Sequence, residues 1–190
     1  MNLQPIARGL AQLGLPFKTE ARPEGGPALR CSFFADSPGA VVLDRGEVQI
    51  VEVSSVEDRL VARVVLRETR MNYDGYVIAM AAFNDLNRFA TLGIRAFVVP
   101  MPAEANSPLR PYLGVLEGVV PGNTTPEFLG AAVNELMVLA IMAKTAMGIA
   151  STGDGLPKGI EGWYSFIGGP FHAAIARTRA TVSILGEAVP

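Results

Sequence analysis

Cysteine and histidine are nearly absent from this sequence: each occurs once in 190 residues, as Cys31 and His172. A single cysteine excludes an intrachain disulfide and a multi-cysteine metal site, and a single histidine excludes a two-histidine metal site. A Ser-His-Asp triad would depend on His172, and the Gly-x-Ser-x-Gly nucleophile motif does not occur. Cys31, close to Phe33 and Phe34, is typical of a small buried hydrophobic residue. His172, near the start of a predicted helix, is typical of a surface or capping residue.

An excess of charge of one sign is also missing, as is a long apolar run. The formal net charge is −2, so no global positive field draws the chain to nucleic acid or to an anionic membrane. The most hydrophobic window, Leu136 to Ala143, has eight residues, far short of the ~20 that span a bilayer. Residues Met1 to Pro5 lack the features of a secretory signal. We therefore expect a soluble, cytoplasmic protein. Because 49% of its residues are hydrophobic, the chain can bury a sizeable apolar core.

Motifs for metal, phosphate or acid–base chemistry are lacking as well. Glu52, Glu57 and Asp58 cluster near a turn, which is typical of a solvated acidic tip, and no Asp-x-Asp pattern occurs. The glycine-rich segment from Gly153 to Gly159 has neither the Walker spacing nor the dinucleotide spacing, and it follows a predicted helix instead of a strand. The sequence thus predicts no catalytic residue, no metal and no cofactor.

What is present is a clear alternation of helical and extended patterns. Apolar residues at helical spacing predict helices over 3–13, 76–92 and 124–147, the last introduced by a capping box of Thr124 and Glu127 with Pro126 in the first turn. Valine-rich segments predict strands at 47–54, 59–67, 94–101 and 112–120, and the runs 29–35 and 40–43 form either one interrupted strand or a hairpin. The polar segment 16–26 reads as a loop.

This order predicts an α+β fold: an antiparallel five-stranded sheet packed by helices in the order α-β-β-β-α-β-β-α. We expect the domain to end near Met147. Seven glycines and a proline in residues 148–169 indicate a connector, and a C-terminal helical extension follows over 170–190.

Arginines follow one predicted strand. Arg59, Arg63 and Arg67 share strand parity, which predicts a basic stripe on one face, and Arg70 follows close by in the sequence. Such a stripe is either a solvated sheet face beside acids such as Glu68, or a contact for an acidic partner or nucleic acid. The strand lacks the interleaved aromatic residues that stack bases.

Two asparagines lie one turn apart on the helix predicted over 76–92. Asn84 and Asn87 gain nothing from helix propensity, so a tertiary role is expected. That role is a hydrogen bond at the helix edge, either to a neighbouring strand or across a subunit interface; plain solvent exposure is the alternative. Arg88 lies mainly on the same polar side.

The segment Phe83-Asn84-Asp85-Leu86-Asn87-Arg88-Phe89, closing a helix before a strand, resembles the YbjN-like family of bacterial sensory-transduction regulators. The later helix start Thr125-Pro126-Glu127 also fits, and the resemblance covers residues 1–147. It implies a fold like that of type III secretion chaperones, often dimeric, which binds a segment of another protein. Family members are linked to stress adaptation, and no catalytic residues belong to the pattern.

The expected function is therefore a non-enzymatic, chaperone-like or regulatory module, a homodimer that binds a client protein and no membrane. The expected contact residues are Asn84, Asn87, Arg88, Arg59, Arg63 and Arg67. The alternative is direct binding of single-stranded nucleic acid through the arginine face, and an enzyme with a site assembled from distant residues is a weaker third hypothesis.

Overall fold

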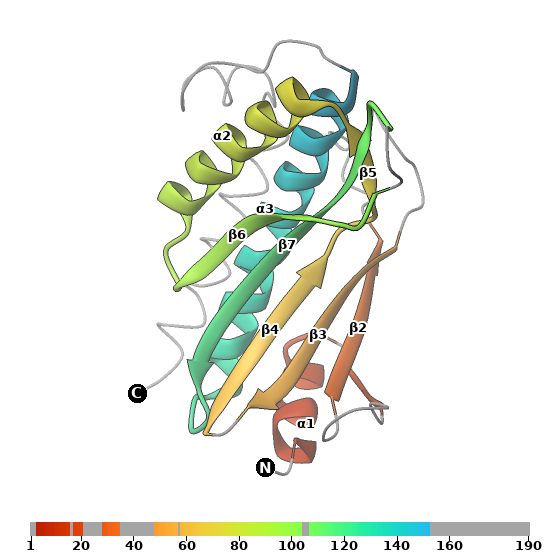
Figure 1. The fold of residues 1–190 in the computed structure, drawn as a ribbon. Helices are drawn as coiled ribbons and strands as arrows, with labels where there is room; N and C mark the ends of the chain where they lie inside the picture. Colours follow the sequence, from red (N-terminus) through yellow and green to blue (C-terminus); the bar gives the residue numbers. More distant parts are fainter. Residues whose placement is uncertain are drawn as a thin grey trace.

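The structure is a computed structural model that describes residues 3–15, 17–20, 28–34, 48–56, 58–103 and 107–152. Its helices are α1 (Gln4–Gln12), α2 (Tyr73–Phe89) and α3 (Pro126–Thr152). Its strands are β1 (Lys18–Glu20), β2 (Ala28–Phe34), β3 (Val48–Val56), β4 (Arg59–Val65), β5 (Thr69–Met71), β6 (Ile94–Pro100) and β7 (Arg110–Pro121). Figure 1 shows how these elements are arranged.

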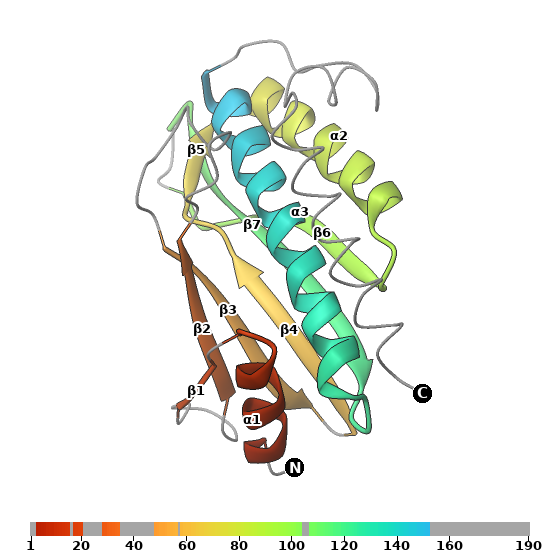
Figure 2. The same ribbon diagram turned by 180° about the vertical axis from the view of Figure 1, so that it is seen from behind.

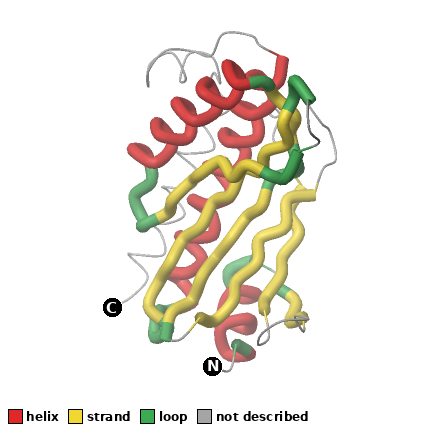
Figure 3. Tube along the Cα trace, in the orientation of Figure 1, coloured by secondary structure: helices red, strands yellow, loops and turns green. Residues whose placement is uncertain are grey.

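All strand pairs are antiparallel and belong to one twisted sheet (Figure 3). The strands run in the order β1, β2, β3, β4 and β7, and β6 pairs with the other side of β7. β4 and β5 line the same side of β7, because Val65 is opposite Val115 and Thr69 is opposite Tyr112. The chain thus advances one residue more on that side than on β7, which is a β-bulge. β4 and β5 are therefore two parts of one bent strand.

The three helices cover one face of this sheet, as Figure 2 shows. Alternate residues of β4 point to that face, and Leu60 and Val64 are fully buried there. α3 lies along the middle of the helical layer, and its Leu129, Leu136 and Met147 are buried in the same core. The result is a two-layer sandwich with a single apolar core between the helices and the sheet.

Local sequence signals fix the helix ends. The Asn72 side chain accepts a hydrogen bond from Gly75 N at 2.8 Å and caps α2, whereas Gly93, with φ of 72°, allows the turn into β6. At the start of α3 the capping oxygen belongs to Thr125, which accepts from Phe128 N at 3.3 Å. The predicted cap at Thr124 was therefore one residue early.

The predicted fold class, α+β with an antiparallel sheet and helices in this order, is confirmed. Among the described residues the sheet has seven strands, where the sequence predicted five. β1 lies in the segment predicted as a loop, and β5 follows the bulge, where the predicted strand 59–67 breaks. Both extra strands have three residues, and such short strands exist only because β2 and β7 pair with them.

The predicted end of the third helix at Met147 was five residues early, because α3 continues to Thr152. Ile149 and Ala150 are buried against the domain, and this burial offsets the low helix propensity of Gly148. The remainder of the predicted connector, the predicted helix over 170–190, His172 and the Cys31 side chain lie outside the described part of the chain.

α3 is the one helix in the described part that is long and apolar enough to cross a membrane. The eight-residue apolar window seen in the sequence belongs to this 27-residue helix. Of its most apolar stretch, 56% is buried inside the domain, as expected for the core helix of a globular protein.

Candidate interaction surface

The face of the sheet opposite the helices bears no helix among the described residues (Figures 1 and 2). We call it the open face. Because side chains alternate along a strand, the neighbours of the core residues point to it. On its central strands it carries Arg59, Val61, Arg63 and Val65 from β4, Val115, Glu117 and Val119 from β7, and Arg95 and Phe97 from β6.

A row of charges crosses the open face at right angles to the strands. The strand register places Arg63 opposite Glu117, and Glu117 in turn opposite Arg95. On the other side of Arg63 the row continues through the positions of Glu52 and Arg30. From Glu52 to Arg95 the sign of the charge alternates at every strand.

The centre of this row is an ion pair. Arg63 Nη2 lies 2.7 Å from Glu117 Oε2, and Arg63 Nε donates to the same oxygen at 2.9 Å. The two side chains remain 44% and 25% exposed, so solvent screens the pair and its contribution to stability is about 1 kcal/mol or less. The main effect of the ion pair is therefore to hold the two side chains in position, and its contribution to the stability of the fold is small.

Apolar rows flank the charged row on both sides. On one side Val61 is opposite Val119; on the other Val65 is opposite Val115, which is opposite Phe97. Val65, Phe97 and Val119 are 52%, 41% and 40% exposed, whereas Val61 and Val115 are buried. Each of the two valine pairs thus consists of one exposed side chain and one that its neighbours cover.

Asn87 binds the outer backbone edge of β6. Its Nδ2 donates to Ala96 O at 2.8 Å, and its Oδ1 accepts from Ala96 N at 2.7 Å. Of the two alternatives for Asn87, a neighbouring strand or a second subunit, the structure shows the strand. Its side chain amide takes the place that the backbone of another strand would occupy.

Asn84 and Arg88 lie on the exposed surface of α2, and Arg88 pairs with Asp85 at 3.3 Å. α2 belongs to the helical layer, so these residues are separated from Arg59 and Arg63 by the sheet (Figure 2). The six predicted contact residues therefore do not form one site.

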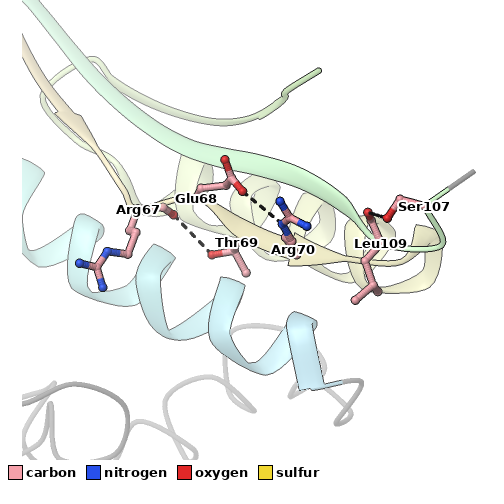
Figure 4. A network of polar contacts seen from close by, with 6 residues as sticks. All are labelled: Arg67, Glu68, Thr69, Arg70, Ser107 and Leu109. Atoms are coloured by element: carbon pink, nitrogen blue, oxygen red, sulfur yellow. Dashed lines mark hydrogen bonds and ion pairs between the residues drawn. The ribbon is translucent and has the colours of Figure 1, made fainter. Parts of the chain in front are cut away.

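Arg67 departs from the predicted arginine stripe. β4 ends at Val65, and Arg67 follows in the bulge, where the strand alternation no longer applies. Thr69 Oγ1 donates to Arg67 O at 3.4 Å, and Arg70 pairs with Glu68 at the same distance. Figure 4 shows the Arg67 guanidinium extending away from the Glu68–Arg70 pair.

The end of the bent strand at Arg70 lies beside the connection between β6 and β7 (Figure 4). There Ser107 Oγ donates to Leu109 O at 2.6 Å, which closes the turn into β7. Leu109 is 44% exposed. This end of the sheet is polar around Arg70 and apolar at Leu109.

Arg59 lies at the opposite end of the open face. It borders an open depression of about 740 Å³ between the β3–β4 turn and the β7–α3 turn. The depression is lined by Asp58, Arg59, Val119, Val120, Pro121, Gly122 and Asn123. In the described part of the chain, no three His, Cys, Asp or Glu side chains lie together in a group that would hold a metal ion.

Glu117 and Arg95 were missed by sequence reasoning. Glu117 is the one charged residue in the predicted strand 112–120, and Arg95 is the second residue of the preceding predicted strand, 94–101. Both were visible as polar residues at alternate positions. Only the register, which joins residues 54 apart in the case of Arg63 and Glu117, places them in one row.

No protein-family model matches the chain, and no curated protein matches it. Among solved structures, the chain is similar to the crystal structure of YbjN from E. coli, a proposed transcription regulator. The identity is 14%, the match covers 80% of this chain and 94% of that chain, and the TM-score is 0.47. A likeness of this size concerns the fold and says nothing about function.

Proposed function

We propose that this chain is a non-enzymatic protein-binding module, chaperone-like or regulatory, which binds a segment of another protein through the open face. The observation that carries the proposal is the pattern on that face, where two partly exposed apolar rows flank a row of alternating charge. Exposed apolar side chains gathered beside charges are typical of protein interfaces. The apolar rows would supply the affinity, and the charges would set the orientation of the partner.

The arrangement of the arginines favours a protein over a nucleic acid. Arg63 is paired with Glu117 and Arg70 with Glu68, so two of the four arginines expected to contact nucleic acid have their charge balanced within the chain. A phosphate backbone needs several uncompensated cations along its path. The glutamates of the charged row would also repel the negatively charged phosphates.

The broader role follows the family resemblance. We propose that the module works in the cytoplasm in bacterial stress adaptation, with a client protein that is held in a particular conformation or kept from other partners. Exposed side chains on a rigid sheet suit such a role, because little conformational entropy is lost when the client binds.

Site-specific photocrosslinking tests the proposed surface. A photoreactive phenylalanine analogue is placed at Val65 or Phe97 on the open face, and at Val77, which is 48% exposed on α2, as the matched control. We expect covalent protein adducts from positions 65 and 97 in cells and none from 77, with the adduct identified by mass spectrometry. Adducts from position 77 alone, or nucleic-acid adducts from 65 and 97, would refute the proposal.

A further inference from the structure

The pattern of the open face is complementary to itself. Across β4 and β7 it has three rows: Val61 with Val119, Arg63 with Glu117, and Val65 with Val115. Consider a second copy turned over by a two-fold axis that runs parallel to the strands, between β4 and β7. This operation keeps each row at its own height and exchanges β4 with β7. Each row of one copy then faces the same row of the second copy, so that a residue of β4 lies over the residue of β7 from its own row.

The charges match in this arrangement. Arg63 faces Glu117 of the second copy, and Glu117 faces Arg63 of the second copy, so two intrachain ion pairs become one network of four charges. At the flanks, β6 lies over β3, and the position of Arg95 lies over that of Glu52. All four facing positions of the row have opposite signs.

The pattern of exposed and covered apolar residues matches as well. Val119, which is 40% exposed, faces the buried Val61 of the second copy, and Val65, which is 52% exposed, faces the buried Val115. Each exposed valine thus meets a covered one, and the facing rows are apolar on both copies. Apolar side chains on the inner faces are what fills the space when two sheets pack face to face.

The other in-plane axis fails. A two-fold axis at right angles to the strands, along the charged row, would keep each strand over itself and place Arg63 on Arg63 and Glu117 on Glu117. Like charges in direct opposition destabilise an interface and exclude the arrangement. The charges therefore select one geometry out of two.

We propose that the open face binds a second copy of this chain, with the two sheets packed around a two-fold axis parallel to β4 and β7. The inference rests on the proposed function, since it concerns the same surface, which the second copy would cover when no client protein is bound. Four strands about 4.8 Å apart and seven residues of about 3.3 Å each give roughly 400 Å² of flat contact per copy. This is smaller than the ~800 Å² per partner of a standard stable interface, so the dimer should be weak and reversible.

The test is a pair of charge-reversal variants of the full chain, Arg63→Glu and Glu117→Arg. In either variant alone, the two central contacts of the homodimer become repulsive. We expect its self-association to weaken at least tenfold relative to wild type, measured by sedimentation equilibrium at about 10–500 µM, where weak dimers form. In an equimolar mixture every facing position again has opposite signs. The mixture should therefore form a heterodimer with wild-type affinity.

The mixture separates an interface from a folding role, because both variants lose the same intrachain ion pair and only the interface is repaired by mixing. Thermal unfolding of each variant checks that it folds. A wild-type chain that stays monomeric at 500 µM would overturn the inference, as would single variants that associate like wild type or a mixture that does not associate. If the wild type is monomeric but position 65 still crosslinks to another protein, the homodimer is wrong and the proposed function stands.

Discussion

At the scale of single residues, two asparagines one turn apart on α2 have different surroundings. Asn87 exchanges two hydrogen bonds with the backbone of Ala96, which is 4% exposed, whereas Asn84 is exposed on the helix surface. The pattern Asn-x-x-Asn by itself does not show this difference. What distinguishes the two positions is which side of α2 faces β6.

We expect Asn87→Ala to lower the free energy of unfolding by about 2–3 kcal/mol, because it leaves a backbone donor and a backbone acceptor without partners in a poorly solvated place. Asn84→Ala is the matched control and should change stability by less than about 0.5 kcal/mol, with a small gain in helix propensity. Urea unfolding of both variants measures this. Equal effects of the two substitutions would show that Asn87 does not hold β6.

At the scale of elements, α2 and α3 approach each other closely at Gly75. A Cβ atom added to this residue would overlap the carbonyl oxygen of Ala150 on α3 and touch the Met71 side chain at 3.0 Å. The backbone of another helix cannot rotate away as a side chain can. The spacing between the two helices is therefore set by the absence of a side chain at this position.

Gly75→Ala should consequently destabilise the fold by about 1–3 kcal/mol, although alanine is the better helix former by about 1 kcal/mol. The reverse change at an exposed position of the same helix, Ala81→Gly, should cost about 1 kcal/mol from propensity alone. Chemical unfolding gives both numbers. If Gly75→Ala stabilised the protein, the close contact between α2 and α3 would be wrong.

The elements show what the sequence can and cannot predict. The three helices of the described residues were recognised from the spacing of their apolar residues, since a periodic pattern is a local property. β1 and β5 were not, because three residues carry no periodic signal and become strands only through β2 and β7. The site was harder still: Arg63 was predicted, but its partner Glu117 is known only once the order of β4 and β7 is known.

At the scale of the whole molecule, the order of strands predicts an order of stability. β4 and β7 have a hydrogen-bonded neighbour on each side and the core helix α3 beneath them, whereas β1 is a three-residue strand at the margin. Opening the centre of the sheet therefore requires that most of the core be lost. Opening β1 disrupts only its pairing with β2 and its contact with α1.

Native-state hydrogen exchange should reproduce this order. We expect the slowest amides in β4, β7 and α3, with protection close to that of global unfolding, and the fastest strand amides in β1. In Asn87→Ala, the amide of Ala96 should lose protection by more than tenfold relative to the amides of β7. Exchange of β1 as slow as that of β7 would contradict the central position of β7 in the sheet.

The two hydrogen bonds between Asn87 and Ala96 also affect how the protein resists aggregation. The margin of a sheet offers a ready template on which further chains can stack, and β6 presents a partly exposed Phe97 beside that margin. Because the asparagine amide occupies the donor and the acceptor in the middle of the strand, an incoming strand cannot complete its hydrogen bonds there. One side chain on the neighbouring helix α2 thus protects the middle of this edge strand against pairing with other chains, without an additional strand.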